Sequence, residues 1–181
     1  MKLDKLEEKI KIPEHCTVAY ADYQLTVKGI KSEVVRKIHS PKVQIHVENG
    51  FVVFRVNKPS KREKTLLFTY VAHVHNMFKG VTQGHIYKLK VCSGHFPMSV
   101  SIKNNVFEIK NFFGAKVPKH LTISKGVAVA VNGNDVTVES SDKELAGQTA
   151  ASIERLTRRP GFDKRIFQDG IYIVEKDGKA I

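Results

Sequence analysis

Cys92 and His95 are the residues whose types and spacing could most readily support covalent or metal chemistry. A cysteine thiolate can act as a nucleophile beside a histidine base, and both side chains can bind zinc. A nucleophilic site would also need an orienting group and an oxyanion motif, and neither is evident. A zinc site would need a second spaced pair, whereas His15 and Cys16 are adjacent. We therefore predict no catalytic residue, no metal and no cofactor, and keep a metal- or thiol-dependent enzyme acting on nucleic acid as the alternative.

Net charge is more informative than any catalytic motif. The chain has 30 Lys and Arg against 18 Asp and Glu, a formal net charge of +12, and a pI near 9.7. Such a surface attracts polyanions and releases condensed counterions when it meets phosphate. The glycines form neither a P-loop nor a GxGxxG turn, so a small-molecule substrate is not expected. Nucleic acid is the predicted partner class, and a solvated basic surface without a partner is the alternative.

Composition places the chain among ordinary folded proteins. Apolar residues make up 41% and charged residues 27%, which argues against wholesale disorder. No stretch approaches the roughly 20 apolar residues that span a bilayer, and the start MKLDKLEEKIKI alternates charged and apolar residues, unlike a signal peptide. Cys16 and Cys92 are too few for a disulfide framework. We expect a cytoplasmic protein with no membrane partner.

A segment without acidic residues runs from Ile109 to Asn134. Within it, Asn111-Phe-Phe-Gly114 interrupts the strand pattern and predicts a loop. Loop aromatics can stack on unpaired bases, and loop amides can contact phosphate. For the two Phe side chains, stacking and plugging the core are equal alternatives. For the lysines we favour RNA contact, and the basic residues of the segment are Lys110, Lys116, Lys119, His120 and Lys125.

A second basic cluster surrounds the end of a predicted helix near Leu156. Cations there would complement the helix dipole, which is the structural alternative. Five positive groups exceed what a helix end requires, so we favour phosphate contact, mostly through guanidinium groups that bind phosphate oxygens in pairs. The members are Arg155, Arg158, Arg159, Lys164 and Arg165.

These residues must be positioned by elements that occur twice. Ser60-Lys-Arg-Glu63 and Ser141-Asp-Lys-Glu144 lie 81 positions apart, and each has the Ser-x-x-Glu pattern of a capping box at a helix start. Apolar residues at helical spacing follow both. Gly80 is the predicted stop of the first helix and Pro160-Gly161 that of the second.

Segments of alternating apolar and polar residues precede each helix and predict strands. They occupy residues 25–27, 43–47 and 51–56 in the first half, and 107–109, 127–131 and 136–138 in the second, with a further run at 86–91. Asn49-Gly50, between the second and third of these segments, predicts a hairpin turn. The sequence thus predicts an α+β protein of two tandem repeats, each an antiparallel β-sheet packed with one α-helix. The predicted domains are residues 1–82 and 83–181.

Several motifs in order resemble the archaeal and eukaryotic form of the large-subunit ribosomal protein six family. The likeness runs from about Ile12 to Lys176, and the short segment after Ile173 is typical of archaeal members. The motifs are His75-Asn-Met-Phe-Lys-Gly-Val-Thr-Gln-Gly84 with Tyr87-Lys88, His95-Phe-Pro97, Glu108-Ile-Lys-Asn-Phe-Phe-Gly-Ala-Lys116, Asp142-Lys-Glu-Leu-Ala-Gly-Gln-Thr-Ala-Ala151 and Phe167-Gln-Asp-Gly-Ile-Tyr-Ile173.

The resemblance implies an architectural role in the large ribosomal subunit. It implies that the C-terminal repeat is the main rRNA-binding domain, beside the sarcin-ricin region at the stalk base, close to the subunit interface and the factor-binding site. Neighbouring large-subunit proteins, including those of the stalk base, are the implied protein partners. By likeness, Lys110, Asn111 and Lys116 face RNA, as do His95 and the segment with Gln168. With the basic clusters, the predicted rRNA-binding set is Lys88, His95, Lys110, Asn111, Lys116, Lys119, Arg155, Arg158, Arg159, Lys164, Arg165 and Gln168.

Overall fold

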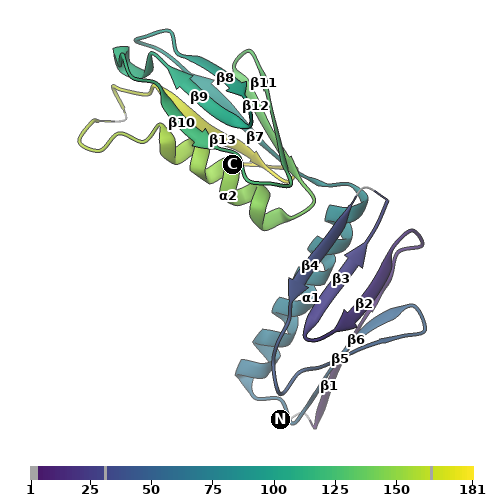
Figure 1. Ribbon diagram of the computed structural model, residues 1–181. Coiled ribbons are helices and arrows are strands. Elements are labelled where there is room, and N and C mark those ends of the chain that lie inside the picture. Colours follow the sequence, from purple (N-terminus) through teal and green to yellow (C-terminus); the bar gives the residue numbers. More distant parts are fainter. Residues whose placement is uncertain (1–3, 31, 164) are drawn as a thin grey trace. The chain divides into compact units, whose positions relative to one another are not determined.

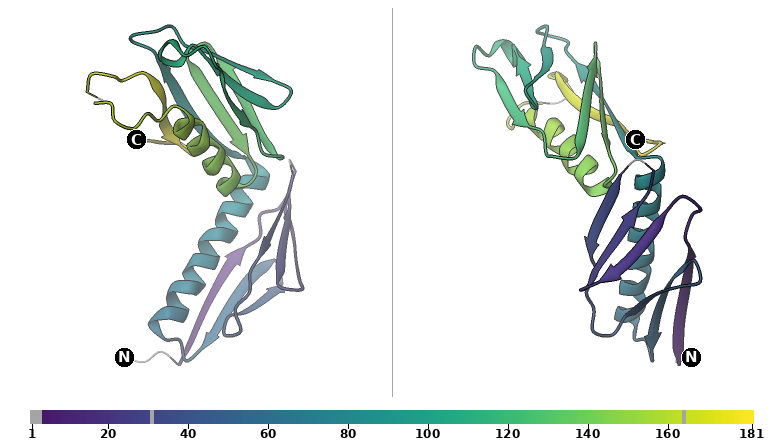
Figure 2. Two further views of the ribbon diagram at one scale, coloured as in Figure 1. Left: turned by 60° about the vertical axis from the view of Figure 1, so that its left-hand side comes forward. Right: turned by 45° about the vertical axis from the view of Figure 1, so that its right-hand side comes forward.

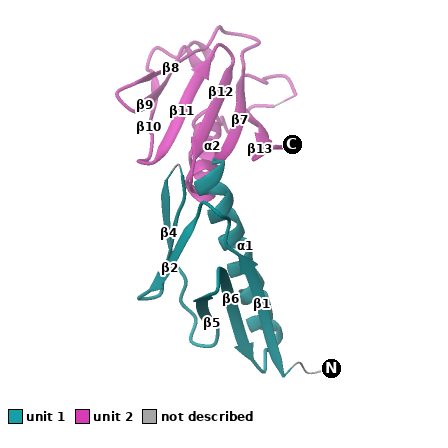
Figure 3. Ribbon diagram, turned by 90° about the vertical axis from the view of Figure 1, so that its right-hand side faces the viewer, with its two compact units in different colours: residues 1–84 teal, residues 85–181 magenta. Residues whose placement is uncertain are grey.

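The chain folds into two compact units, residues 1–84 and 85–181 (Figure 3). The structure is a computed structural model, and it describes residues 4–30, 32–163 and 165–181. The division falls between Gly84 and His85, rather than between residues 82 and 83 as expected from the sequence. Each unit has its own hydrophobic core, built from residues of that unit.

Unit 1 contains two small antiparallel sheets and one long helix within its described residues (Figures 1 and 2). The sheets have the strand orders β1-β6-β5 and β2-β3-β4. Helix α1 contacts strands of both sheets, so all three elements enclose one core. The elements are β1 (Lys5–Lys11), β2 (Thr17–Ala21), β3 (Gln24–Lys28), β4 (Glu33–Lys37), β5 (Gln44–Glu48), β6 (Phe51–Asn57) and α1 (Lys61–Thr82).

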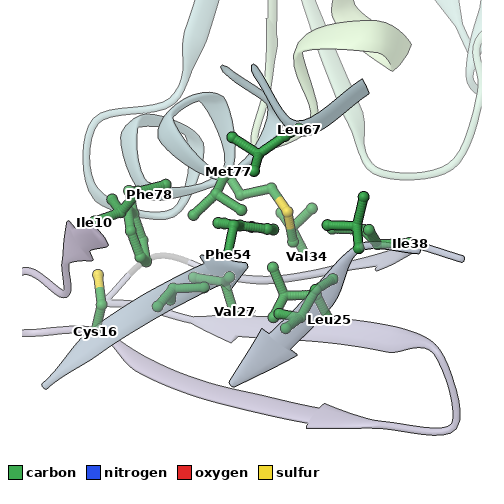
Figure 4. Packing of buried hydrophobic residues seen from close by; sticks show 14 of the residues in the cluster. Ile10, Cys16, Leu25, Val27, Val34, Ile38, Phe54, Leu67, Met77 and Phe78 are labelled. Carbon is green, nitrogen blue, oxygen red and sulfur yellow. The ribbon is translucent and has the colours of Figure 1, made fainter. Parts of the chain in front are cut away.

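The core of unit 1 follows from alternation along the predicted strands. Phe54 of β6 and Leu25 of β3 are completely buried, and Figure 4 shows them facing Met77 of α1. The hairpin of β5 and β6 turns at Asn49 and Gly50, whose φ values of 50° and 77° suit a two-residue turn that follows the twist of the strands. The predicted hairpin is confirmed.

Helix α1 starts where the sequence predicts and ends later. The Glu63 carboxylate accepts hydrogen bonds from the Ser60 N–H and hydroxyl, which confirms this capping box. The predicted stop at Gly80 is wrong, because Gly80 is buried inside the helix. Gly84, with φ of 88°, supplies the left-handed residue instead, and its N–H donates to the Lys79 carbonyl.

Unit 2 repeats this plan with a larger sheet. Its described residues form a three-stranded sheet, β10-β9-β8, and a five-stranded sheet, β11-β12-β7-β13-β14, both antiparallel. The helix α2 contacts β7, β12 and β13 of the larger sheet and β10 of the smaller one. The elements are β7 (His85–Cys92), β8 (Ser99–Lys103), β9 (Val106–Lys110), the 3-10 turn η1 (Phe112–Gly114), β10 (Lys119–Thr122), β11 (Val127–Asn132), β12 (Asp135–Ser140), α2 (Lys143–Leu156), β13 (Gly170–Lys176) and β14 (Lys179–Ala180).

The predicted α+β fold of two tandem repeats is confirmed, with one correction. The predicted strands and helix occur in order in both units. Among the described residues, however, each unit has two sheets rather than one. Some of the extra strands lack a clear apolar alternation; β1, for example, reads KLEEKIK and has charged side chains at most positions. Such strands form because a partner strand supplies the backbone hydrogen bonds, which the pattern of a single segment does not reveal.

The ends of α2 differ from the sequence prediction. Asp142, not Ser141, is the N-cap, and its carboxylate accepts from the Glu144 N–H at 2.8 Å. The helix ends at Leu156, before the predicted stop at Pro160-Gly161.

Hydrogen bonds join the C-terminal end of α2 to β13. The Thr157 hydroxyl accepts from the Ile171 N–H at 3.0 Å, and the Glu154 carboxylate accepts from the Ile173 N–H at 3.2 Å. These contacts hold the end of the helix against β13, one turn before Pro160.

Candidate nucleic-acid interface

The Asn111–Gly114 loop places its two Phe rings in different environments. Asn111 and Phe113 both have positive φ, 58° and 51°, and the Phe112 and Phe113 rings meet edge to face with 4.9 Å between their centroids. Phe112 is only 5% exposed and belongs to the core of unit 2, whereas Phe113 is half-buried at its edge. The Asn111 side chain donates to the Pro97 carbonyl at 3.0 Å and ties the loop to the segment before β8. One Phe therefore plugs the core and the other is available near the surface.

Phe113 belongs to an aromatic cluster drawn from separate segments. Its ring centroid lies 6.1 Å from those of both Phe162 and Phe167, which follow α2. The Phe162 and Phe167 rings meet edge to face at 5.1 Å, and the His95 ring lies 5.3 Å from Phe167. A cavity of about 390 Å³ opens beside these rings, and its lining comprises Phe113, Ala151, Glu154, Arg155, Thr157, Arg158, Arg159, Phe162, Phe167, Asp169 and Tyr172.

Arginines surround this aromatic cluster. The Arg159 guanidinium carbon lies 3.8 Å from the Phe162 ring centroid and 4.9 Å from that of Phe113, within the range of a cation–π interaction. Arg155 and Arg158 are exposed and line the same cavity. The structure thus brings together three of the predicted arginines, and it places them beside aromatic rings that the sequence did not connect to them.

Lys119 has a structural partner at the end of α2. Its ammonium group donates to the Leu156 carbonyl at 2.7 Å and lies 4.5 Å from the Phe112 ring centroid. Burial, together with the positive charge of Arg159, lowers the pKa of Lys119 below its ordinary value. Lys119 therefore provides the cation that complements the helix end.

Asp169 is the important residue of the site that sequence reasoning did not single out. Its buried carboxylate accepts from the Gly94 N–H at 2.7 Å and the His95 N–H at 3.1 Å, and it lies 3.2 Å from His95 Nδ1. Burial alone raises the pKa of Asp169, but these hydrogen bonds and that of the Phe96 N–H outweigh it, so the pKa lies below its ordinary value. The available signal was its place in the motif Phe167-Gln-Asp-Gly-Ile-Tyr-Ile173, one of those that carry the family resemblance.

The other predicted residues lie apart from the cavity or have partners. Lys88, on β7, pairs with Glu175 at 2.9 Å. Lys110 lies 3.4 Å from the Glu108 carboxylate, and Lys116 is exposed in the loop before β10. The remaining three are Arg165, which binds the Asp163 carboxylate through two nitrogens, Gln168, which donates to the Arg165 carbonyl, and Lys164, which lies outside the described residues.

Cys92 and His95, which suggested catalytic or metal chemistry, have other surroundings in the structure. His95 Nδ1 faces Asp169 and its ring packs near Phe167, while the Cys92 thiol is free and half-buried. Among the described residues, no group of three or more His, Cys, Asp and Glu side chains is arranged to hold a metal ion. Within residues 4–30, 32–163 and 165–181, no helix has the length and apolar character needed to cross a membrane.

Comparison with known proteins connects this chain to one family. The family described as ribosomal protein L6 matches residues 12–84 and again residues 96–170, one match in each unit. The chain is 43% identical over 176 residues to the large ribosomal subunit protein uL6 of Methanococcus vannielii, which covers 97% of each chain. It is 42% identical over 177 residues to the protein of the same name from Desulfurococcus amylolyticus, with 96% of each chain covered. The resemblance seen in the motifs is confirmed, and the chain belongs to the ribosomal protein L6 family.

Proposed function

We propose that this chain is a structural, non-catalytic component of the large ribosomal subunit in the cytoplasm, and that unit 2 binds large-subunit rRNA. Its family and the names of its archaeal relatives support the ribosomal role. The observation that carries the RNA-binding role is the group of exposed arginines, Arg155, Arg158 and Arg159, beside a surface cavity lined with Phe rings. Guanidinium groups bind phosphate oxygens and aromatic rings stack on unpaired bases.

The geometry weakens the helix-dipole alternative for these arginines. Lys119 already donates to the last helical carbonyl, that of Leu156. Arg158 and Arg159 lie beyond the helix and are exposed. Since the helix end has its cation, these two side chains remain available to phosphate.

The proposed interface extends from the arginines to the neighbouring loops. His95 is held by Asp169 and Asn111 by Pro97, so both are presented by fixed backbone. Lys88 and Lys119 also remain proposed RNA contacts, but each already has a protein partner, so their loss should weaken binding less. The further proposed contacts are Lys110, Lys116, Lys164, Arg165 and Gln168.

The place of binding is proposed from the family resemblance. It puts unit 2 beside the sarcin-ricin region at the stalk base, close to the subunit interface and the factor-binding site, with large-subunit proteins as neighbours. Crosslinking in cells followed by sequencing of the bound RNA tests this. We expect reads concentrated on large-subunit rRNA near the sarcin-ricin loop. Reads spread over messenger or transfer RNA would overturn the proposal.

A further inference from the structure

We propose that the cavity beside Arg159 binds one unstacked nucleobase of the RNA, held against the Phe162 ring. This proposal deepens the proposed function and rests on it, because the base would belong to the rRNA that unit 2 binds. It names the part of the RNA that this cavity would hold and the ring against which it would lie, whereas the proposed function names RNA as the partner of unit 2 as a whole.

Three Phe rings border a cavity that opens at the protein surface. Here a cavity of about 390 Å³ remains beside Phe113, Phe162 and Phe167, and Phe162 is 38% exposed. Phe112, one residue from Phe113, shows the contrast, since it is buried in the core. The three rings are therefore placed as a surface for a flat ligand rather than as core.

The chemistry of the lining fits a nucleotide. Every base has a π-face that can stack on an aromatic ring or on a planar guanidinium group. The Arg159 guanidinium carbon lies 3.8 Å from the Phe162 ring centroid, so a planar cation and an aromatic ring meet at the cavity. Arg155 and Arg158 line the same cavity and can bind the phosphates on either side of the base. An aromatic side chain of a neighbouring protein would use the rings but not the arginines.

Two carboxylates in the lining of the cavity hold the surrounding backbone in place. Glu154 accepts from the Ile173 N–H at 3.2 Å, and Asp169 accepts from the N–H groups of Gly94 and His95. Both acids are thus directed to backbone donors. Their hydrogen bonds join α2 to β13, and the segment before β13 to the segment after β7.

Binding of the full chain to a transcript of large-subunit rRNA tests the proposal. Phe162→Leu removes the ring but keeps an apolar side chain, and we expect it to raise the Kd by roughly five- to a hundred-fold, the range for loss of one base stack. Its salt dependence should stay unchanged, because no charge is lost. Phe162→Tyr keeps the ring and should bind as the unmodified protein does. Phe68→Leu, at an exposed Phe of α1, is the matched control and should also have no effect.

Ultraviolet crosslinking of the unmodified protein to the same transcript, read by mass spectrometry, gives an independent answer if Phe162→Leu does not fold. We expect a nucleotide adduct on Phe113, Phe162 or Phe167. If the protein binds rRNA but forms adducts only elsewhere, and Phe162→Leu binds as tightly as Phe162→Tyr, the base pocket is wrong and the proposed function stands. If these rings crosslink to a neighbouring protein in ribosomes, the pocket binds protein instead. Absence of rRNA binding by the unmodified chain would contradict both proposals.

Discussion

The Asp169 carboxylate lies 3.2 Å from His95 Nδ1 and also accepts the backbone N–H of the same His95, across 74 positions of sequence. One buried side chain thereby fixes both the backbone and the ring of a residue proposed to face RNA. It also joins the segment after β7 to the segment before β13, and the latter supplies Phe167 and Asp169 to the lining of the aromatic cavity.

Replacing Asp169 should therefore lower the stability of the fold. Asp169→Asn keeps the size of the side chain but loses a charged acceptor for the N–H groups of Gly94 and His95. We expect a loss of about 1–3 kcal/mol in the free energy of unfolding, the usual cost of leaving buried donors poorly satisfied. Denaturant unfolding of the full chain measures it. Asp135→Asn, at an exposed acid of β12, is the control, and equal effects of the two changes would contradict the assigned role.

The capping box of α1 should make stability sensitive to acid. The Ser60 hydroxyl, followed by the Lys42 ammonium group, lowers the pKa of Glu63 from 4.5 to about 2. Because the pKa is lower in the folded chain, ionised Glu63 stabilises the fold above pH 4.5, and this contribution is lost as pH falls from about 4.5 through about 2.

The comparison is between the unmodified chain and Glu63→Gln over that pH range. Their difference in unfolding free energy should be constant above pH 4.5 and should shrink toward pH 2. Glu14→Gln, at an exposed acid outside the helices and strands, serves as the control. A difference that does not change with pH would mean that the Glu63 charge is irrelevant to the cap.

Removing two arginines from the proposed interface should alter the salt dependence of rRNA binding. Arg158→Ala with Arg159→Ala should weaken binding and reduce the slope of log K against log salt by roughly one to two, because each phosphate contact releases condensed counterion. Arg62→Ala with Lys64→Ala removes the same amount of charge from exposed positions of α1 and should leave the slope nearly unchanged. Filter binding at several salt concentrations measures the slope for each variant. Equal slopes for the two double variants would mean that net charge, not this interface, drives binding.

The junction of α2 and β13 should depend on one hydroxyl. Thr157→Val keeps the shape but leaves the buried Ile171 N–H without its acceptor, and we expect a loss of about 1–3 kcal/mol in the free energy of unfolding. Thr157→Ser keeps the hydroxyl and should lose much less. Thermal or denaturant unfolding compares the two, and similar losses would show that the methyl group matters rather than the hydrogen bond.

Local patterns in the sequence predicted the elements well. Alternation identified strands such as β5 and β6, and Asn49-Gly50 identified their turn, because both features depend on neighbouring residues alone. The capping box at Ser60 was likewise local. Gly80 misled, because a glycine ends a helix only where the chain needs a left-handed residue, and Gly84 meets that need here.

The site could be predicted only in part for the same reason. Charge patterns found Arg158 and Arg159, but nothing in the sequence indicated that Arg159 would lie over Phe162, or that Asp169 would hold His95. These contacts depend on how loops from separate strands meet. Lys119 stays a predicted RNA contact, and its contact with the Leu156 carbonyl could not be foreseen because it requires β10 to lie beside α2.

The contacts between α2 and β13 also bear on the life of the chain before assembly. A free sheet edge exposes N–H and C=O groups to which a strand of another molecule can add. On β13, Thr157 occupies the Ile171 N–H, Glu154 occupies that of Ile173, and the two-residue strand β14 pairs with Glu175 and Lys176. Few backbone groups of this edge are therefore left to pair with a strand of a second copy. This should limit aggregation of the newly made protein before it joins the ribosome.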